Sequence, residues 1–145
     1  MTHDARIRTL KISLIFTAFI ALLMFLSLFT GLKVVMSFFL DLTHMPLDGA
    51  QSLSSDAEHL LTAISAGVLF GFCVALWHLT TEIYAHNAAL GRRLILTSVL
   101  SWYVIDTAGS WIVGAWMNCI LNTLFMLSLV LPILRPEPTE DVQTA

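Results

Sequence analysis

Residues 94–114, LILTSVLSWYVIDTAGSWIVG, decide the fold because they combine the length of a membrane-spanning helix with one ionisable side chain, Asp106. A helix needs about 20 mainly apolar residues to cross the hydrocarbon core of a bilayer, and this stretch supplies them. A carboxyl group at the centre of such a helix costs about 2.5 to 3.5 kcal/mol on insertion scales, so it normally faces other helices and has a partner there. The stretch therefore predicts a helical membrane bundle with Asp106 turned inward.

The composition of the whole chain agrees with a membrane protein. The 145 residues have the length of one domain, and 57% of them are hydrophobic while only 12% are charged. Soluble proteins carry about 25% charged residues. Lipid must therefore cover much of the apolar surface. No basic run of the kind that binds nucleic acid is found, so we expect no nucleic-acid partner.

Four apolar stretches predict an all-α, antiparallel bundle of four transmembrane helices at about residues 12–32, 56–80, 94–114 and 117–134. Residues 1–11 form a polar N-terminal segment, and the acidic, proline-containing residues 135–145 are predicted to be disordered. Ser55 and Glu58 have the spacing of a capping box, which places the start of the second helix there. Residues 33–42 either follow a break near Gly31 as a short interfacial helix, the interpretation we favour, or extend the first helix.

The basic residues predict the orientation. Lys33 lies on one side of the predicted membrane, and the other side receives Arg6, Arg8, Lys11, Arg92, Arg93 and Arg135. Basic residues are concentrated in cytoplasmic segments. We therefore expect a multi-pass membrane protein with both termini in the cytoplasm and lipid as its immediate partner; the cell inner (plasma) membrane is the location that the resemblance described below implies.

Polar side chains of the third and fourth helices predict an intramembrane cluster. Its members are Tyr103, Asp106, Ser110, Asn118 and Asn122. A turn centred near Gly114 would place Ser110 level with Asn118, and Asp106 level with Asn122. We therefore predict a hydrogen bond between Asp106 and Asn122. The remaining positions around the carboxyl group would be filled by Tyr103, Thr107 or Ser110.

Small residues predict close helix packing. Ala63, Gly67 and Gly71 recur at every fourth position of the second helix, a pattern that lets a neighbouring backbone approach closely. We expect this stripe to contact another helix of the same chain rather than a second copy. Gly114, at the turn between the third and fourth helices, is assigned to close packing as well.

Enzymatic and cofactor chemistry finds little support in the sequence. Intramembrane aspartyl proteolysis needs two acids, and Asp106 is alone at its depth. Cys73 and Cys119 form no Cys-x-x-Cys pair, and His59 and His78 lie at opposite ends of one helix, which excludes a haem between them. Metal-binding residue types occur in and just after the loop before the second helix, but without a diagnostic spacing; they are Asp41, His44, Asp48, Asp56 and His59. We therefore expect no catalytic residue, metal or cofactor.

Two classes of function remain open. The first, which we favour, is an accessory or interaction subunit without chemistry of its own, bound in a larger membrane complex or a homo-oligomer. The second is an oligomeric proton- or ion-linked transporter or channel that uses Asp106, reached from the outer mouth past Asp56 and His59. A polar cavity leading to Asp106 would favour transport, whereas dry packing around it would favour the first class.

Four motifs carry a resemblance to known proteins. They are DAEH at 56–59, AGVLFG at 66–71, WYVIDTAGS at 102–110 and NCILN at 118–122. Over about residues 56–134 the chain resembles a loose group of small uncharacterised bacterial four-helix membrane proteins. The resemblance implies the fold and a bacterial inner-membrane location, and it implies no activity.

Overall fold

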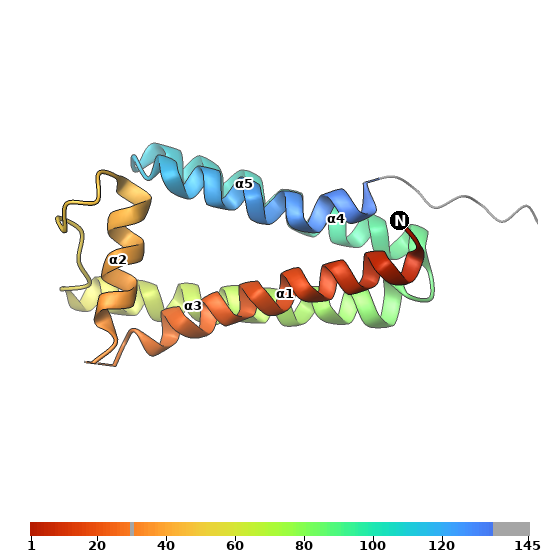
Figure 1. Ribbon diagram of the computed structural model, residues 1–145, viewed down its shortest axis with the longest axis horizontal. Helices are drawn as coiled ribbons and strands as arrows, with labels where there is room; N and C mark the ends of the chain where they lie inside the picture. The colour runs from red at the N-terminus through yellow and green to blue at the C-terminus, as the bar shows by residue number, and fades with distance from the viewer. Residues whose placement is uncertain (30, 135–145) are drawn as a thin grey trace, which may run out of the picture.

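The chain is all-helical in the computed structural model, which describes residues 1–29 and 31–134 (Figure 1). No strand is found in these two ranges. The elements in order are α1 (His3–Leu26), α2 (Lys33–His44), α3 (Asp56–His78), the π-helical turn η1 (Leu79–Tyr84), α4 (Ala88–Ile112), α5 (Trp116–Val130) and the 3₁₀ turn η2 (Leu131–Ile133). The prediction of disorder for residues 135–145 falls outside the described residues.

Four helices are long and apolar enough to span a membrane, as predicted. Their extents are His3–Leu26, Asp56–Tyr84, Ala88–Ile112 and Trp116–Ile133. Two of them begin earlier than expected because a side chain caps each start. The Thr2 hydroxyl accepts from the Ala5 amide at 3.3 Å, and the Asn87 side-chain oxygen accepts from the Leu90 amide at 3.0 Å. The basic residues near the starts of α1 and α4 are therefore helical; they are Arg6, Arg8, Lys11, Arg92 and Arg93.

The predicted capping box sets the start of α3. The Ser55 hydroxyl accepts from the Glu58 amide at 3.2 Å, and the Glu58 carboxylate accepts from the Ser55 amide at 2.7 Å. Each side chain satisfies a backbone donor that the first helical turn leaves without an intrahelical partner. The sequence pattern and the structure agree to the residue.

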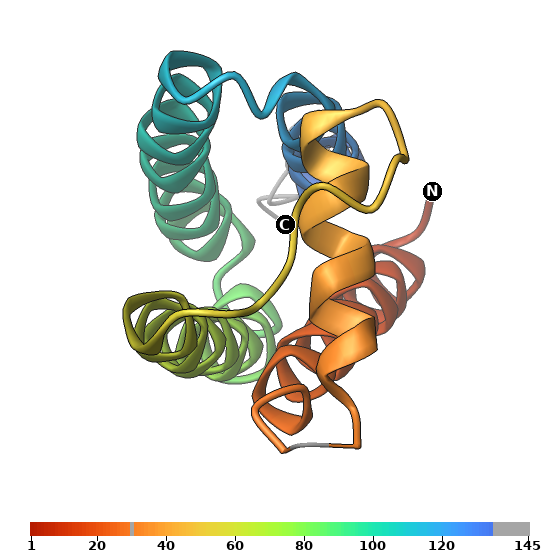
Figure 2. The ribbon, with the colours of Figure 1, turned by 90° about the vertical axis from the view of Figure 1, so that its left-hand side faces the viewer.

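α2 is a separate helix rather than an extension of α1. The chain leaves α1 after Leu26 through two turns, and the Ser27 hydroxyl donates to the Met24 carbonyl at 2.6 Å. α2 then crosses the end of the long helices and contacts α1 and α5 there (Figure 2). The interpretation with a break near Gly31 is the one that the fold supports.

The long helices form two pairs joined at one end. α1 packs along α3 and α4 packs along α5, whereas contacts between α3 and α4 are sparse. The main apolar core joins the two pairs near the N-terminus, around the turn η1. It consists of Leu10, Leu14, Leu76, Tyr84, Ile95, Val99, Leu129, Val130 and Ile133. The opposite end carries α2 and the loop that leads to α3.

The intramolecular contact predicted for the small-residue stripe is absent at Gly67 and Gly71, whereas Ala63 is half-buried. Gly67 and Gly71 are exposed, and no atom lies within 4 Å of where a Cβ would stand at either position. α3 instead buries Thr62 and Ala66, each one residue before a stripe position, and its main packing partner is α1. A step of one residue rotates a helical position by about 100°, so the stripe points away from the bundle.

Gly114 has a conformational role rather than the packing role predicted for it. Its φ of 79° lies in the left-handed region, and no atom lies within 4 Å of a Cβ built there. Its amide donates to the Trp111 carbonyl at 3.1 Å, and the next amide, of Ala115, donates to the Ser110 carbonyl at 2.9 Å. Glycine adopts this conformation without the steric penalty that a side chain brings. The tight turn fixes how α5 runs back along α4.

Candidate functional site

The predicted hydrogen bond between Asp106 and Asn122 is present. The Asn122 side-chain amide donates to the Asp106 Oδ1 atom at 3.1 Å. The Ser110 hydroxyl lies 3.3 Å from the same oxygen and 2.8 Å from the Asp106 carbonyl oxygen, so one proton is shared between two acceptors. The Asn118 amide donates to the Ser110 hydroxyl at 2.8 Å. Four predicted residues thus form one chain of hydrogen bonds across the hairpin.

Burial makes these contacts energetically relevant. Asn122 and Ser110 are each 7% exposed, while Asp106 is half-buried. Hydrogen bonds between membrane helices contribute about 0.6 kcal/mol on average and up to about 1.7 kcal/mol. The Asn122 bond to Oδ1 is of this kind and, together with the Ser110 bond inside α4, offsets part of the insertion cost of an acid, about 2.5 to 3.5 kcal/mol. The hairpin therefore supplies the partner that the Asp106 carboxyl group requires.

Tyr103 contacts α5 but does not contact Asp106. Its hydroxyl lies 3.0 Å from the Thr123 hydroxyl, which in turn donates to the Cys119 carbonyl at 2.7 Å. Since Thr123 has a single proton, Tyr103 is the donor of this pair. The Thr107 hydroxyl is buried and has no hydrogen-bond partner within the described residues. Of the three groups predicted to complete the surroundings of the carboxyl, only Ser110 does so.

The predicted outer-mouth residues are not connected to Asp106. The His59 ring nitrogen Nδ1 lies 2.7 Å from the Ser55 carbonyl oxygen, so the ring folds back on its own helix. Asp56 is exposed in the first turn of α3. Among residues 1–29 and 31–134, no hydrogen bond joins either side chain to the cluster, and no three metal-binding side chains come together.

Two structural roles escaped the sequence analysis. Asp41 is 6% exposed, and its carboxylate accepts from the Gly49 amide at 3.0 Å and the Gln51 amide at 3.4 Å, which fastens the loop after α2. Arg92 donates to the carbonyls of Ile133 at 2.7 Å and Leu134 at 2.6 Å, and so caps the turn η2 that follows α5. The hairpin register that pairs Asp106 with Asn122 also brings Arg92 near the end of the fourth membrane helix. No sequence signal marks the contacts of Asp41.

The cluster is self-contained. Its hydrogen bonds lie within α4 or join α4 to α5, and it lines neither of two surface hollows, of about 570 Å³ and 350 Å³. The larger hollow lies between α1 and the end of α5, and the smaller one is formed by apolar side chains of α1. Such an arrangement fixes the register of two helices.

Comparison with known proteins finds no matching family model, no similar curated protein and no similar solved structure. The resemblance to small bacterial membrane proteins therefore stays a prediction.

Proposed function

We propose that the protein is a small multi-pass membrane protein that binds another membrane protein as an accessory subunit and has no chemistry of its own. Four apolar helices support the membrane location. The charge distribution supports cytoplasmic termini, because α1 and the start of α4 carry five basic residues near one end of the bundle. At that end Lys11 Nζ lies 5.0 Å from the centre of the Trp77 ring, a pairing suited to the membrane interface.

The observation that carries the proposal is the outward-facing stripe of α3. Gly67 and Gly71 are spaced by one helical turn, and the protein places no atom within 4 Å of a Cβ at either position. Membrane helices use such a surface to bring two backbones into close van der Waals contact. Since the chain itself does not fill it, we assign the stripe to a helix of a larger membrane complex. A second copy of the chain is the other occupant that the experiment below distinguishes.

The polar cluster supports the same function indirectly. Asp106, Ser110 and Asn122 fasten α4 to α5, and neither surface hollow reaches them. In this proposal the acid holds the hairpin in register and does not move a proton or an ion.

A transporter that uses Asp106 is the second candidate. Half-burial of the carboxyl group and the unpartnered Thr107 hydroxyl next to it are the observations that favour it. The test is pH-dependent flux in proteoliposomes. Flux that wild type supports and Asp106→Asn abolishes would establish transport, whereas equal behaviour of the two proteins leaves the structural role.

The accessory role is tested by purification from the native membrane in a mild detergent. We expect the wild type to bring down a defined membrane partner, and Gly67→Leu with Gly71→Leu to lose it. Gly109→Leu is the matched control, because Gly109 is likewise exposed with no atom within 4 Å of a Cβ but lies on α4. Recovery of the chain only with copies of itself would identify a homo-oligomer. Equal recovery of the partner by all variants would contradict the assignment of the stripe.

A further inference from the structure

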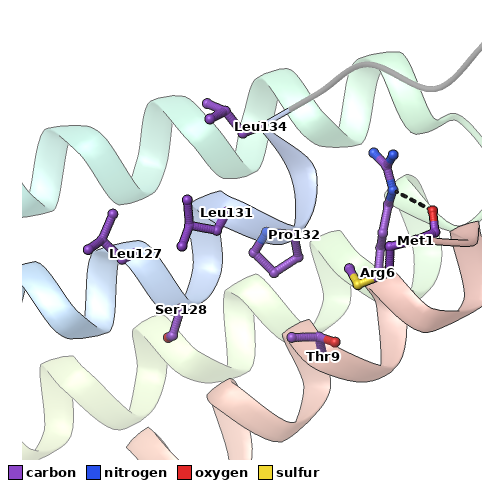
Figure 3. A pocket seen from close by; sticks show the side chains of 8 residues that line it. All are labelled: Met1, Arg6, Thr9, Leu127, Ser128, Leu131, Pro132 and Leu134. Carbon is purple, nitrogen blue, oxygen red and sulfur yellow. Dashed lines mark hydrogen bonds between the residues drawn. The ribbon is translucent and has the colours of Figure 1, made fainter.

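The two ends of the helical bundle differ in charge. At one end Arg6 lies beside the larger surface hollow (Figure 3), and Arg92 caps the turn η2 there. At the other end α4 turns into α5 through residues 111–116, WIVGAW, which contain no charged side chain. Ile112 and Val113 of this turn are 80% and 66% exposed. An exposed apolar surface of this kind marks a site of interaction with a membrane or another protein.

The length of α4 places this turn at the boundary of a membrane. From Arg93 to Ile112 the helix rises about 29 Å at 1.5 Å per residue, close to the roughly 30 Å of a hydrocarbon core. With Arg93 at one boundary, Ile112 reaches the other, and any tilt of the helix draws the turn further into the lipid. Trp111 and Trp116 are exposed on either side of the turn, and tryptophan is enriched at membrane interfaces. The turn therefore ends in the interface and does not emerge into water.

The short helix α2, at the same end, has a polar side that the following loop covers. The Ser37 hydroxyl accepts from the Leu53 amide at 3.1 Å, and the Asp41 carboxylate accepts from the Gly49 amide at 3.0 Å. The loop lies beyond α2 at the end of the bundle (Figures 1 and 2). The polar side of α2 therefore points along the bundle axis, toward the aqueous phase.

A second side of α2 is apolar and exposed. Val34 is 70% exposed and Phe38 is 58% exposed. Phe38 follows Ser37 by one position, which turns it about 100° around the helix axis, and the buried Met36 is turned by the same angle the other way. Since α2 contacts α5 and α1, the side with Met36 faces the bundle. The side with Phe38 therefore faces sideways, away from the bundle, at the level of the α4–α5 turn (Figure 1).

We infer that Val34, Phe38 and residues 111–116 form a collar that binds phospholipids of the leaflet at this end. Its side chains lie among the glycerol groups and the first carbons of the acyl chains, where amphipathic helices bury their apolar face. Continuity with the apolar surface of α1 favours lipid over a partner protein. Phe25 and Phe29 are exposed where the chain leaves α1 toward α2, and their rings pack edge to face with centres 6.0 Å apart. The inference goes beyond the accessory role and requires only that the four long helices span a membrane.

The test is electron paramagnetic resonance of spin labels in proteoliposomes of the purified full chain. Cys73→Ala and Cys119→Ala remove the native thiols, and Phe38→Cys or Val113→Cys then carries the label in the collar. Ser52→Cys is the matched control, because Ser52 is exposed at the same end but lies in the loop beyond α2. We expect collar labels to collide more often with oxygen, which dissolves in lipid, than with a water-soluble nickel complex, and the control label to show the reverse.

Two results of this measurement would overturn the inference. Collar labels that collide more often with the nickel complex would show that α2 and the turn lie in water. Collar labels shielded from both reagents would show that a second copy of the chain covers the collar instead of lipid.

Tryptophan quenching keeps the inference testable if a labelled protein fails to fold. Trp111→Phe keeps an aromatic ring at the turn and is compared with wild type in the same liposomes. Iodide, which stays in water, should quench no larger a fraction of the emission in wild type than in Trp111→Phe. A phospholipid brominated near its headgroup should quench wild type more strongly than the variant. Extra iodide quenching in wild type, or equal quenching of the two proteins by the brominated lipid, would contradict the collar.

Discussion

Replacement of Asn122 by leucine tests whether the Asp106 carboxyl group depends on its neighbour across the hairpin. The change keeps the side-chain volume and removes the 3.1 Å hydrogen bond to Oδ1. The carboxyl oxygen then retains only the Ser110 hydroxyl at 3.3 Å, whose proton is shared with the Asp106 carbonyl at 2.8 Å. A buried polar group that loses its partner costs about 1 to 3 kcal/mol, so we expect Asn122→Leu to lower the free energy of unfolding by that amount.

The same reasoning predicts that a second substitution relieves the first. Asp106→Leu removes the group that Asn122 serves, and it also removes an insertion cost of about 2.5 to 3.5 kcal/mol. The double variant Asp106→Leu with Asn122→Leu should therefore be more stable than Asn122→Leu alone. The coupling energy of the cycle should be about 0.6 kcal/mol or more in favour of the native pair.

The assay is reversible unfolding in mixed micelles with increasing dodecyl sulfate, followed by tryptophan fluorescence. Trp102 lies one helical turn from Asp106 and stacks edge-on against Phe125 of α5 with ring centres 5.2 Å apart, so it reports on the hairpin. Asn118→Leu is the control, because it breaks the contact to Ser110 and leaves the Asn122 contact to the carboxyl group in place. Additive effects of Asp106→Leu and Asn122→Leu on the free energy of unfolding would refute the coupling between the two side chains. An Asn122→Leu protein as stable as wild type would refute it as well.

Three further predictions concern the turns that hold the fold together. Gly91→Ala should destabilise the protein by about 1 to 3 kcal/mol in the same unfolding assay, because its Cβ would overlap the Tyr84 Cα and would separate η1 from α4. Gly114→Ala should cost about 1 to 2 kcal/mol, since a φ of 79° strains any residue with a side chain, and an unchanged unfolding midpoint would contradict the role of this turn. Asp41→Ala should release the Gly49 amide and make the loop after α2 susceptible to limited proteolysis, while a loop as resistant as that of wild type would show that other contacts hold it.

Local and short-range features of the fold could be predicted from the sequence. The capping box fixed the first residue of α3, and the glycine at the hairpin turn fixed the register that pairs Asp106 with Asn122. The capping box joins two residues of the same helical turn. The Asp106–Asn122 pair lies within about two helical turns of the glycine that reverses the chain. The early starts of α1 and α4 follow from Thr2 and Asn87, which are local capping signals as well.

The contacts between distant helices could not be predicted in the same way. A stripe of small residues shows that a helix surface permits close approach, but it does not identify what approaches, and no other helix of the described chain lies against Gly67 or Gly71. Tyr103 is long enough to reach either Asp106 or Thr123, and only the packing of α4 on α5 selects Thr123. The clamp by Asp41 depends on the path of an irregular loop, for which the sequence carries no periodic signal.

The central claim is that the hydrogen bonds of Asp106 hold α4 and α5 in register and that the protein acts by binding a membrane partner. The most direct measurement is the amount of partner that copurifies from the native membrane with the folded double variant Asp106→Leu with Asn122→Leu. The account predicts the same recovery as for wild type, because the hairpin is retained and the α3 stripe is untouched. A double variant that unfolds at the same detergent concentration as wild type but recovers no partner would contradict it.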